Sequence, residues 1–491
     1  MMARLRARWW RIKAAVRLLI RDFGWDRRHT PNVARGSARW WTVLLSALAV
    51  GATLVAYGWA IAEAPRLLDR DVLRQASPDA RLGAYHNARL LVTSLGGAFV
   101  VAIGLLYTAR NYRLANRGQV TDRFTKALER LDSTKTHIRI GGVHALARVL
   151  QDSPSHHNDT VDVLIAFLRD RSASSPESTD PSEDLPQELP EDVRATTTAL
   201  AYRPPRRATE RTGLDLHDLR LDYLHAPYGR LRNSDFSGCR LREARLYRAV
   251  LDYAEFSKAD LRGAELSRSS LNFAKLHLAL IDHADLFAAS LNGADLTLSS
   301  LVGTNISHAL LLDACLSKCR LRGAYLSFSD LQLADLTWAD LSQARLNRCR
   351  LHNANLSFAS LRQTEARDSH FDGANLAHVS AAQANFGFSS LNQAILESAD
   401  LRDARLVGAQ MRGVDLSEAD LRGATLMGAD LAGANLSGAD IRGTDLRMAR
   451  LCDANGRNPV HGLDAEDLAG ARTDRGTRLP PRLQRGNGQA G

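Results

Sequence analysis

The sequence predicts a β-solenoid, a chain wound into stacked coils, preceded by an α-helical segment and two apolar runs. Three observations support this prediction. Residues 214–454 repeat a pattern of five residues without slippage. The uncharged runs 40–62 and 90–109 lie well upstream of the repeats, and apolar residues at helical spacing lie between them and the repeats. Because self-similarity at a fixed period identifies an architecture directly, the repeat decides the fold class of this half of the chain.

The repeat is centred on a large apolar residue at every fifth position, beginning at Leu216 and ending at Leu451. Each centre is Leu, Ile, Phe or Met except at three positions, which are Ala226, Ala366 and Ala381. From Ser234 onward, the residue two positions before each centre is small. Side chains two apart lie on one face of an extended segment, so both are expected inside the coil. Glycine is frequent two residues after the centre, which predicts a corner with positive φ, as a type II turn requires.

Units such as residues 419–423 (Ala-Asp-Leu-Arg-Gly) and 434–438 (Ala-Asn-Leu-Ser-Gly) resemble the Ala-(Asp/Asn)-Leu-x-x unit of the pentapeptide-repeat family. The resemblance implies a right-handed quadrilateral β-helix with four units in each coil. Residues twenty apart should then stack in columns. An aspartate column should lie beside an arginine column and form a ladder of mixed charge, comprising Asp400, Asp420, Asp440, Arg402, Arg422 and Arg442.

The interior is expected to be irregular near Ala366, which supplies less volume than the leucine of other units. Phe386 follows it by twenty residues, so its ring should lean into the space that Ala366 leaves. A bulge or local break between Leu361 and Phe386 is the alternative.

Residues 1–39 form a basic segment in which Arg and Lys far outnumber Asp22 and Asp26. Apolar residues recur in it at helical spacing, which predicts an amphipathic helix on an anionic membrane surface. An arm that binds nucleic acid and a solvated basic tail are the alternatives.

Residues 40–62 and 90–109 are each long enough to cross a bilayer, at roughly 34 and 30 Å if helical. The loop between them, residues 63–89, mixes both signs of charge, whereas the outer flanks are basic. The positive-inside rule then predicts a multi-pass protein of the bacterial inner membrane with both termini in the cytoplasm and residues 63–89 outside it. Buried helices of a soluble protein are the alternative.

Residues 115–171 should form a cytoplasmic α-helical module. Two segments of it resemble the module before the repeats in membrane-anchored bacterial pentapeptide-repeat proteins. They are Thr-Asp-Arg-Phe at 121–124 and Arg-Ile-Gly-Gly-Val-His-Ala-Leu at 139–146. His144 is interpreted as a partly buried core histidine. Residues 172–213 are rich in Pro, Ser and Glu and predict a linker, with a short helix near 191–202, that lets the repeats swing relative to the membrane. Residues 455–491 should close the last coil and end in a disordered tail.

The sequence predicts no enzyme, cofactor or metal site. No phosphate-binding glycine loop, nucleophile elbow or HExxH motif is present. Cys315 and Cys319 have the spacing of a zinc-binding pair, but no second pair follows. Cys239, Cys319 and Cys349 occupy the small inward position and are interpreted as packing residues. Repeated aspartates follow from the repeat and do not by themselves indicate acid–base catalysis.

Two functions remain open at this stage. The first is a membrane-tethered scaffold that presents the repeats to a cytoplasmic protein or to a second copy of the chain. The second is DNA mimicry, as in gyrase-protecting pentapeptide proteins, although the nearly balanced charge of the repeats disfavours a nucleic-acid role. Stepping by twenty along one corner gives an apolar column that is unusual for an outward position and that we name the candidate stripe: Leu278, Leu298, Trp338, Phe358 and His378.

Overall fold

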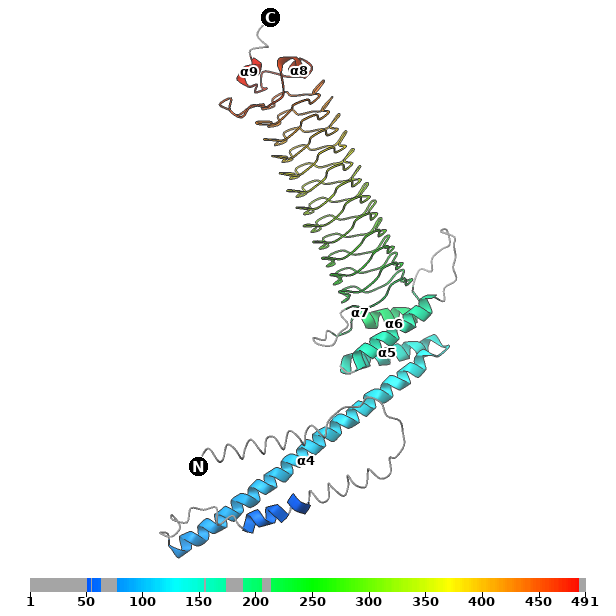
Figure 1. Cartoon of the computed structure of the whole chain (residues 1–491). Coiled ribbons are helices and arrows are strands. Elements are labelled where there is room, and N and C mark those ends of the chain that lie inside the picture. The colour runs from blue at the N-terminus through cyan, green and yellow to red at the C-terminus, as the bar shows by residue number, and fades with distance from the viewer. Residues whose placement is uncertain are drawn as a thin grey trace, which may run out of the picture. The chain divides into compact units, whose positions relative to one another are not determined.

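Figure 1 shows the computed structural model of the chain, which describes most of its residues. The expected basic segment 1–39 lies outside the described residues, as do 40–50 and 63–76. The chain forms two compact units, Met1–Asn116 and Arg117–Gly491. The described residues are 51–53, 55–62, 77–153, 156–173, 189–204 and 213–484, without the side chains of 113–117.

A single long helix, α4 (Pro78–Leu131), contains the second apolar run. It begins earlier than the expected span 90–109, so part of the expected loop 63–89 is helical, and it continues to Leu131, inside the expected helical module 115–171. Among the described residues, its part Pro78–Tyr112 is the one helix long and apolar enough to cross a membrane, with a mean hydropathy of 2.1 and no burial. A shorter apolar helix spans Gly51–Ala62.

The two apolar helices of the N-terminal unit meet at Tyr57. Its hydroxyl donates hydrogen bonds to the carbonyl oxygens of Val92, at 3.3 Å, and Thr93, at 3.0 Å. Gly96 makes this approach feasible, because a Cβ at that position would lie 2.0 Å from the tyrosine oxygen. A small residue thus allows close helix packing, as at helix contacts in membranes.

The helical module of the second unit contains α5 (Thr136–Asp152), α6 (His157–Ala173) and α7 (Glu191–Ala201). The three helices share a buried apolar core made of Val143, Leu146, Leu150, Leu164, Leu168, Val193 and Leu200. An ion pair inside the module joins α5 to α7, with 2.7 Å between Arg139 Nε and Asp192 Oδ2. His144 is exposed rather than partly buried, because it lies on the face of α5 opposite to Val143 and Leu146.

The helical module packs on the first coil of repeats. The amide of Arg230 donates a hydrogen bond to the carbonyl oxygen of Ala201 at 2.8 Å. The hydroxyl of Tyr202 donates one to the carbonyl oxygen of Pro227 at 2.5 Å. Leu200 and Ala201 are buried. The short helix expected near 191–202 within the segment 172–213 is present as α7, and it is fixed against the coil.

The repeats form a stack of coils in which one residue of every five pairs with the residue twenty positions later. Parallel bridges run in this register from the pair Asp215–Asp235 to the pair Asp430–Arg450. Leu336 shows the pattern, since its amide donates to the carbonyl oxygen of Asn355 on the next coil at 2.7 Å. Each side of a coil contributes one bridge to the next coil. At the corners between sides, every fifth residue from Asp218 to Met448 has a positive φ. The expected four units per coil are confirmed.

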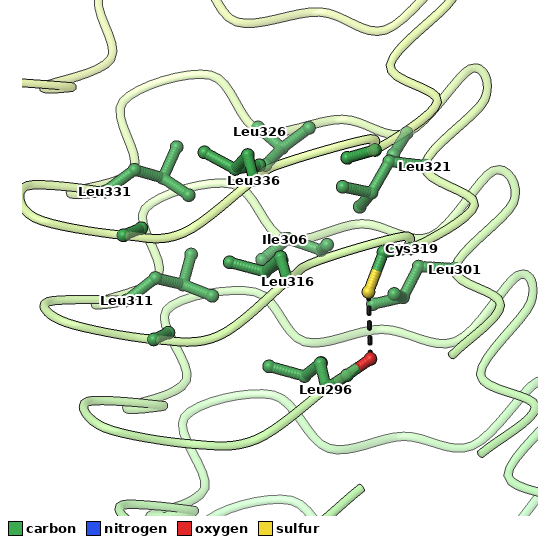
Figure 2. Close-up of a cluster of buried hydrophobic side chains, with 14 of the residues drawn as sticks. Leu296, Leu301, Ile306, Leu311, Leu316, Cys319, Leu321, Leu326, Leu331 and Leu336 are labelled. Carbon is green, nitrogen blue, oxygen red and sulfur yellow. Dashed lines mark hydrogen bonds between the residues drawn. The ribbon is translucent and has the colours of Figure 1, made fainter. Parts of the chain in front are cut away.

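The interior is a column of leucines with small residues beside them (Figure 2). Cys319 occupies one small position, and its thiol donates to the carbonyl oxygen of Leu296 at 2.8 Å. Near Ala366 the bridges continue without a bulge. Phe386 is buried there and meets Phe371 edge-on, with ring centroids 5.6 Å apart. Two phenylalanines thus pack in the coils where the leucine pattern is interrupted.

The C-terminal segment closes the last coil. Bridges from Asp445 to Arg472 and from Arg450 to Arg478 continue the pairing beyond the regular repeats. Two short helices follow, α8 (Ala465–Ala469) and α9 (Pro481–Gln484). The carboxylate of Asp464 accepts hydrogen bonds from backbone amides at the start of α8 and completes a capping box. The open edge of the stack is covered by these residues.

Candidate interaction surface

The candidate stripe lies along one corner of the coil stack. All five members have a φ between 57° and 62°, at the third residue of the turn. Trp338 is 58% exposed and Phe358 is 43% exposed. Because the turn directs these side chains outward, the structure brings the five residues into one column, with Lys318 between Leu298 and Trp338.

The rings of the candidate stripe stack on one another. Trp338 and Phe358 have ring centroids 4.6 Å apart and planes 5° apart, and Phe358 and His378 follow at 4.8 Å and 14°. The spacing of adjacent strands, about 4.7–4.9 Å, sets this ring separation. The faces of the rings cover one another, so their edges are what a partner would meet. Among the described corners, no other column stacks three rings in succession.

Aromatic residues at other corners were not identified from the sequence. Tyr253 stacks on Phe273 with ring centroids 5.1 Å apart, and His308 stacks on Phe328 at 4.8 Å. The guanidinium of Arg348 lies 5.5 Å from the centroid of the Phe328 ring. Stepping by twenty along all four corners would have found these pairs. Stacking is therefore a common feature of the corners, and the candidate stripe is its longest instance.

The corner that follows the candidate stripe along the chain is polar. The side-chain amides of Gln343, Gln363 and Gln383 form a ladder, with hydrogen bonds of 3.1 and 3.0 Å from one coil to the next. These glutamines have the same backbone conformation as Trp338 and Phe358 and lie five residues after Trp338, Phe358 and His378. The chain thus contains a matched polar counterpart to the stripe.

The aspartate and arginine columns form the expected ladder of mixed charge. Arg402 lies 2.7 Å from Asp400 and 3.6 Å from Asp420, and Arg422 lies 2.6 Å from Asp420 and 3.6 Å from Asp440. The hydrogen bond from Arg442 lowers the pKa of Asp440 to about 2. Each carboxylate thus has a guanidinium partner, unlike the unpaired negative charges that a mimic of the DNA backbone would present.

Comparison with known proteins identifies the family of the repeats. A model of pentapeptide repeats matches in eight copies, which together cover residues 230–268 and 279–455. HetL, a pentapeptide repeat protein involved in heterocyst differentiation regulation from the cyanobacterium Nostoc sp. strain PCC 7120, is 30% identical. That match covers 48% of this chain and 90% of HetL, with a TM-score of 0.30. The chain belongs to the pentapeptide repeat family.

Other solved structures are similar to this pentapeptide repeat protein at lower identity. QnrB1, a plasmid-mediated fluoroquinolone resistance protein, is 19% identical over 45% of this chain and 94% of its own, with a TM-score of 0.16. Rfr23, a pentapeptide repeat protein from the cyanobacterium Cyanothece 51142, is 24% identical over 30% of this chain and 63% of its own, with a TM-score of 0.09. A comparison with curated proteins found no match.

The cysteines of this pentapeptide repeat protein lie on different sides of the coil wall. Cys239, Cys319 and Cys349 are buried at small inward positions, as expected, and burial raises the pKa of the Cys319 thiol to about 12. Cys315 is partly exposed on the outside, where its sulfur lies 3.1 Å from the hydroxyl of Thr297. The pair with zinc-like spacing is therefore divided between the inside and the outside of the coil.

A groove of about 670 Å³ lies between the helical module and the first coil of this pentapeptide repeat protein. Its lining mixes apolar and charged residues, including Ile140, His144, Glu191, Arg194, Tyr202 and His225. Asp192, next to Glu191 in the chain, is fully buried and accepts a hydrogen bond from the backbone amide of Val193 at 3.1 Å. Its ion pair with Arg139 holds α7 on α5, whereas Ala201 and Tyr202 make the hydrogen bonds to the coil.

Proposed function

We propose that this pentapeptide repeat protein is a membrane-tethered scaffold whose coil stack lies in the cytoplasm and binds a protein partner. The observation that carries the proposal is α4, in which the apolar residues of Pro78–Tyr112 are unburied over a length that a bilayer requires. Exposed residues such as Leu95, Phe99 and Leu106 need an apolar surrounding. The contact of Tyr57 with the backbone near Gly96 supports a hairpin of two spans.

The candidate stripe supports a protein as the partner. Tryptophan and other aromatic residues dominate the binding energy of many protein interfaces. Here the coil stack holds Trp338, Phe358 and His378 in fixed positions, so little side-chain entropy would be lost on binding. The neutral charge ladder on another side of the stack offers no comparable apolar area. A cytoplasmic protein that presents an apolar ridge or cleft about three coils long is therefore the proposed partner.

Photocrosslinking in native membranes tests this proposal. A photoreactive amino acid replaces Trp338 or Phe358 in the full-length chain, and matched controls carry it at Gln343 or Gln363. A partner protein should crosslink at the first two positions and not at the controls, and Phe358→Ala should weaken the crosslink formed at position 338. Equal products at all four positions, or products only at twice the 53.9 kDa chain mass, would refute docking of a heterologous protein on the stripe.

A further inference from the structure

Three potential metal ligands converge on the outer wall of the coil stack. His352 and Asp372 stack at equivalent turn positions of adjacent coils, and Nδ1 of the histidine lies 3.4 Å from Oδ2 of the aspartate. His370 precedes Asp372 by two residues, and its ring stacks on that of His352 with centroids 5.5 Å apart. One ligand atom from each of the three residues lies within 4.8 Å of the others.

Hydrogen bonds hold the carboxylate of Asp372 in a fixed orientation. Its Oδ1 accepts hydrogen bonds from the Ser390 hydroxyl, from the Asn392 amide at 3.2 Å and from the Asn392 side chain at 2.9 Å. Partial burial would raise the pKa of Asp372, but the hydrogen bonds from Ser390 and Asn392 outweigh it and hold this pKa below its ordinary value. Oδ2 is left facing His352. Hydrogen-bonded support of this kind is typical of carboxylates that bind metal ions.

The donor set matches a particular class of ion. Two imidazoles and one carboxylate suit Zn²⁺, Co²⁺ or Ni²⁺, whereas Ca²⁺ and Mg²⁺ prefer oxygen ligands. Two ligands at about 2.0–2.1 Å from one tetrahedral ion lie about 3.3 Å apart, close to the separation of His352 and Asp372. His370 is exposed and has room to rotate toward the other two.

A second cluster of similar composition provides a contrast. Asp215, His217 and Asp235 also lie close together on the first coil. There, however, Nη2 of Arg169 lies 2.8 Å from Asp215 and 3.2 Å from Nδ1 of His217. The guanidinium already supplies the positive charge and occupies the histidine nitrogen. Beside the cluster of His352, the basic side chain of Arg350 points to Asp330, with 3.8 Å between them.

We propose that His352, His370 and Asp372 bind one divalent transition-metal ion, with Zn²⁺ as the best match, and that water completes its coordination. The ion would join two adjacent coils through their outer wall. Ala366 lies on the same turn of the chain, between His352 and His370, where the interior lacks a leucine. The site would therefore reinforce the stack where its internal packing changes.

Metal titration of the purified full-length protein in detergent, without a histidine tag, tests the site. Co²⁺ should bind at one equivalent with a visible absorption band of a tetrahedral ion, and Zn²⁺ should displace it. His352→Ala and His370→Ala should each abolish the band, and Asn392→Ala should weaken binding by about 10–100-fold. His217→Ala and His283→Ala are the controls and should bind as the wild type does.

Thermal unfolding gives a second measurement on the same variants. Zn²⁺ should raise the unfolding temperature of the wild type and of His217→Ala, and should leave that of His352→Ala unchanged. All four histidines replaced here are at least partly exposed, so circular dichroism should show every variant folded. Equal affinity in wild type and His352→Ala would place the ion elsewhere, and absence of binding at millimolar Co²⁺ and Zn²⁺ would overturn the site itself.

Discussion

A bulky residue with positive φ recurs at the corners of the coils. Trp338, Phe358 and Leu278 adopt this left-handed conformation, which glycine reaches at much lower cost. Hydrogen bonds to the next coil enforce it, as the amide of Trp338 shows by donating to the carbonyl oxygen of Ser357 at 3.1 Å. Side chains at corners thus stand outward and stack, and the backbone rather than the side chain decides their direction.

Phe386→Ala should destabilise the coil stack by about 3–5 kcal/mol, because it removes a fully buried ring that packs edge-on against Phe371. Chemical denaturation followed by circular dichroism measures the change. Phe388→Ala is the control, since Phe388 is exposed and lies two residues further on. A loss as small as that of the control would mean that the space around Ala366 is not filled by Phe386.

Among the helices, the position of α7 in the helical module depends on the buried carboxylate of Asp192. Asp192 has no exposed surface, and Arg139 also donates to the carbonyl oxygens of Ser133 and Thr134 at 3.0 and 2.9 Å. The pair thus connects the end of α4, the start of α5 and the start of α7.

Asp192→Ala should cost about 3–5 kcal/mol, because it leaves the guanidinium of Arg139 buried without its partner. Hydrogen exchange of the α7 amides should then become much faster, and urea should unfold the helical module at a lower concentration. The neighbouring Glu191→Ala affects an exposed side chain and should change neither measurement. If exchange in α7 stays slow in Asp192→Ala, the ion pair with Arg139 is not what holds α7 in the module.

The charge ladder predicts how the coil stack responds to acid. Hydrogen bonds from arginines lower the pKa values of Asp400 and Asp420, and that of Asp440 falls to about 2. A carboxyl group whose pKa is lower in the folded than in the unfolded chain, where it is about 3.9, stabilises the fold above the unfolded value. This stabilisation should be constant from pH 7 to about 5 and should disappear as the pH falls from about 4 to 2.

Unfolding temperatures measured across this pH range test the ladder. A variant with asparagine at positions 400, 420 and 440 should show a shallower decrease in acid than the wild type. Asp313→Asn changes an exposed corner residue outside the ladder and should leave the decrease as it is. Because the pairs are partly exposed, salt should reduce the difference between the variants. A triple variant with an unchanged acid profile would exclude the ladder as its cause.

For the whole molecule, the proposed membrane tether predicts the behaviour of the full chain on fractionation. The wild type should remain in membranes washed with alkaline carbonate. Arginine at both Phe99 and Ile103, on one face of α4, should release it, since each arginine at the centre of a span costs about 2.5–3.5 kcal/mol. Thr125→Arg is the control, because Thr125 lies on the same helix outside the apolar part. This substitution should leave the protein in the membrane. Release of the wild type by carbonate would contradict the tether.

The repeats could be predicted from the sequence in detail, because each residue contacts only its own coil and the next. The inward position of Leu216 and of every fifth residue after it follows from the five-residue pattern alone. The packing of α7 on the first coil could not be predicted, since it depends on Ala201 and Tyr202 meeting residues of the coil that no local pattern marks. The cluster of His352, His370 and Asp372 was missed for a related reason. Its members are separated by eighteen and two residues, so stepping by twenty brings only His352 and Asp372 into one column, and the approach of His370 from the neighbouring column depends on side-chain directions.

The twenty-residue register also determines how such a chain tolerates insertions and deletions. Removing one whole coil would shorten the stack and leave every surviving column aligned, so Trp338 would still share a corner with its neighbours on both sides of the cut. Removing a single unit of five would shift every later residue to the preceding corner of the four-sided coil. Glutamines after the deletion would then lie in the column of the aromatic rings before it. Duplication or loss of segments of twenty residues therefore changes the length of the coil stack. Duplication or loss of five residues instead changes which face the later coils present.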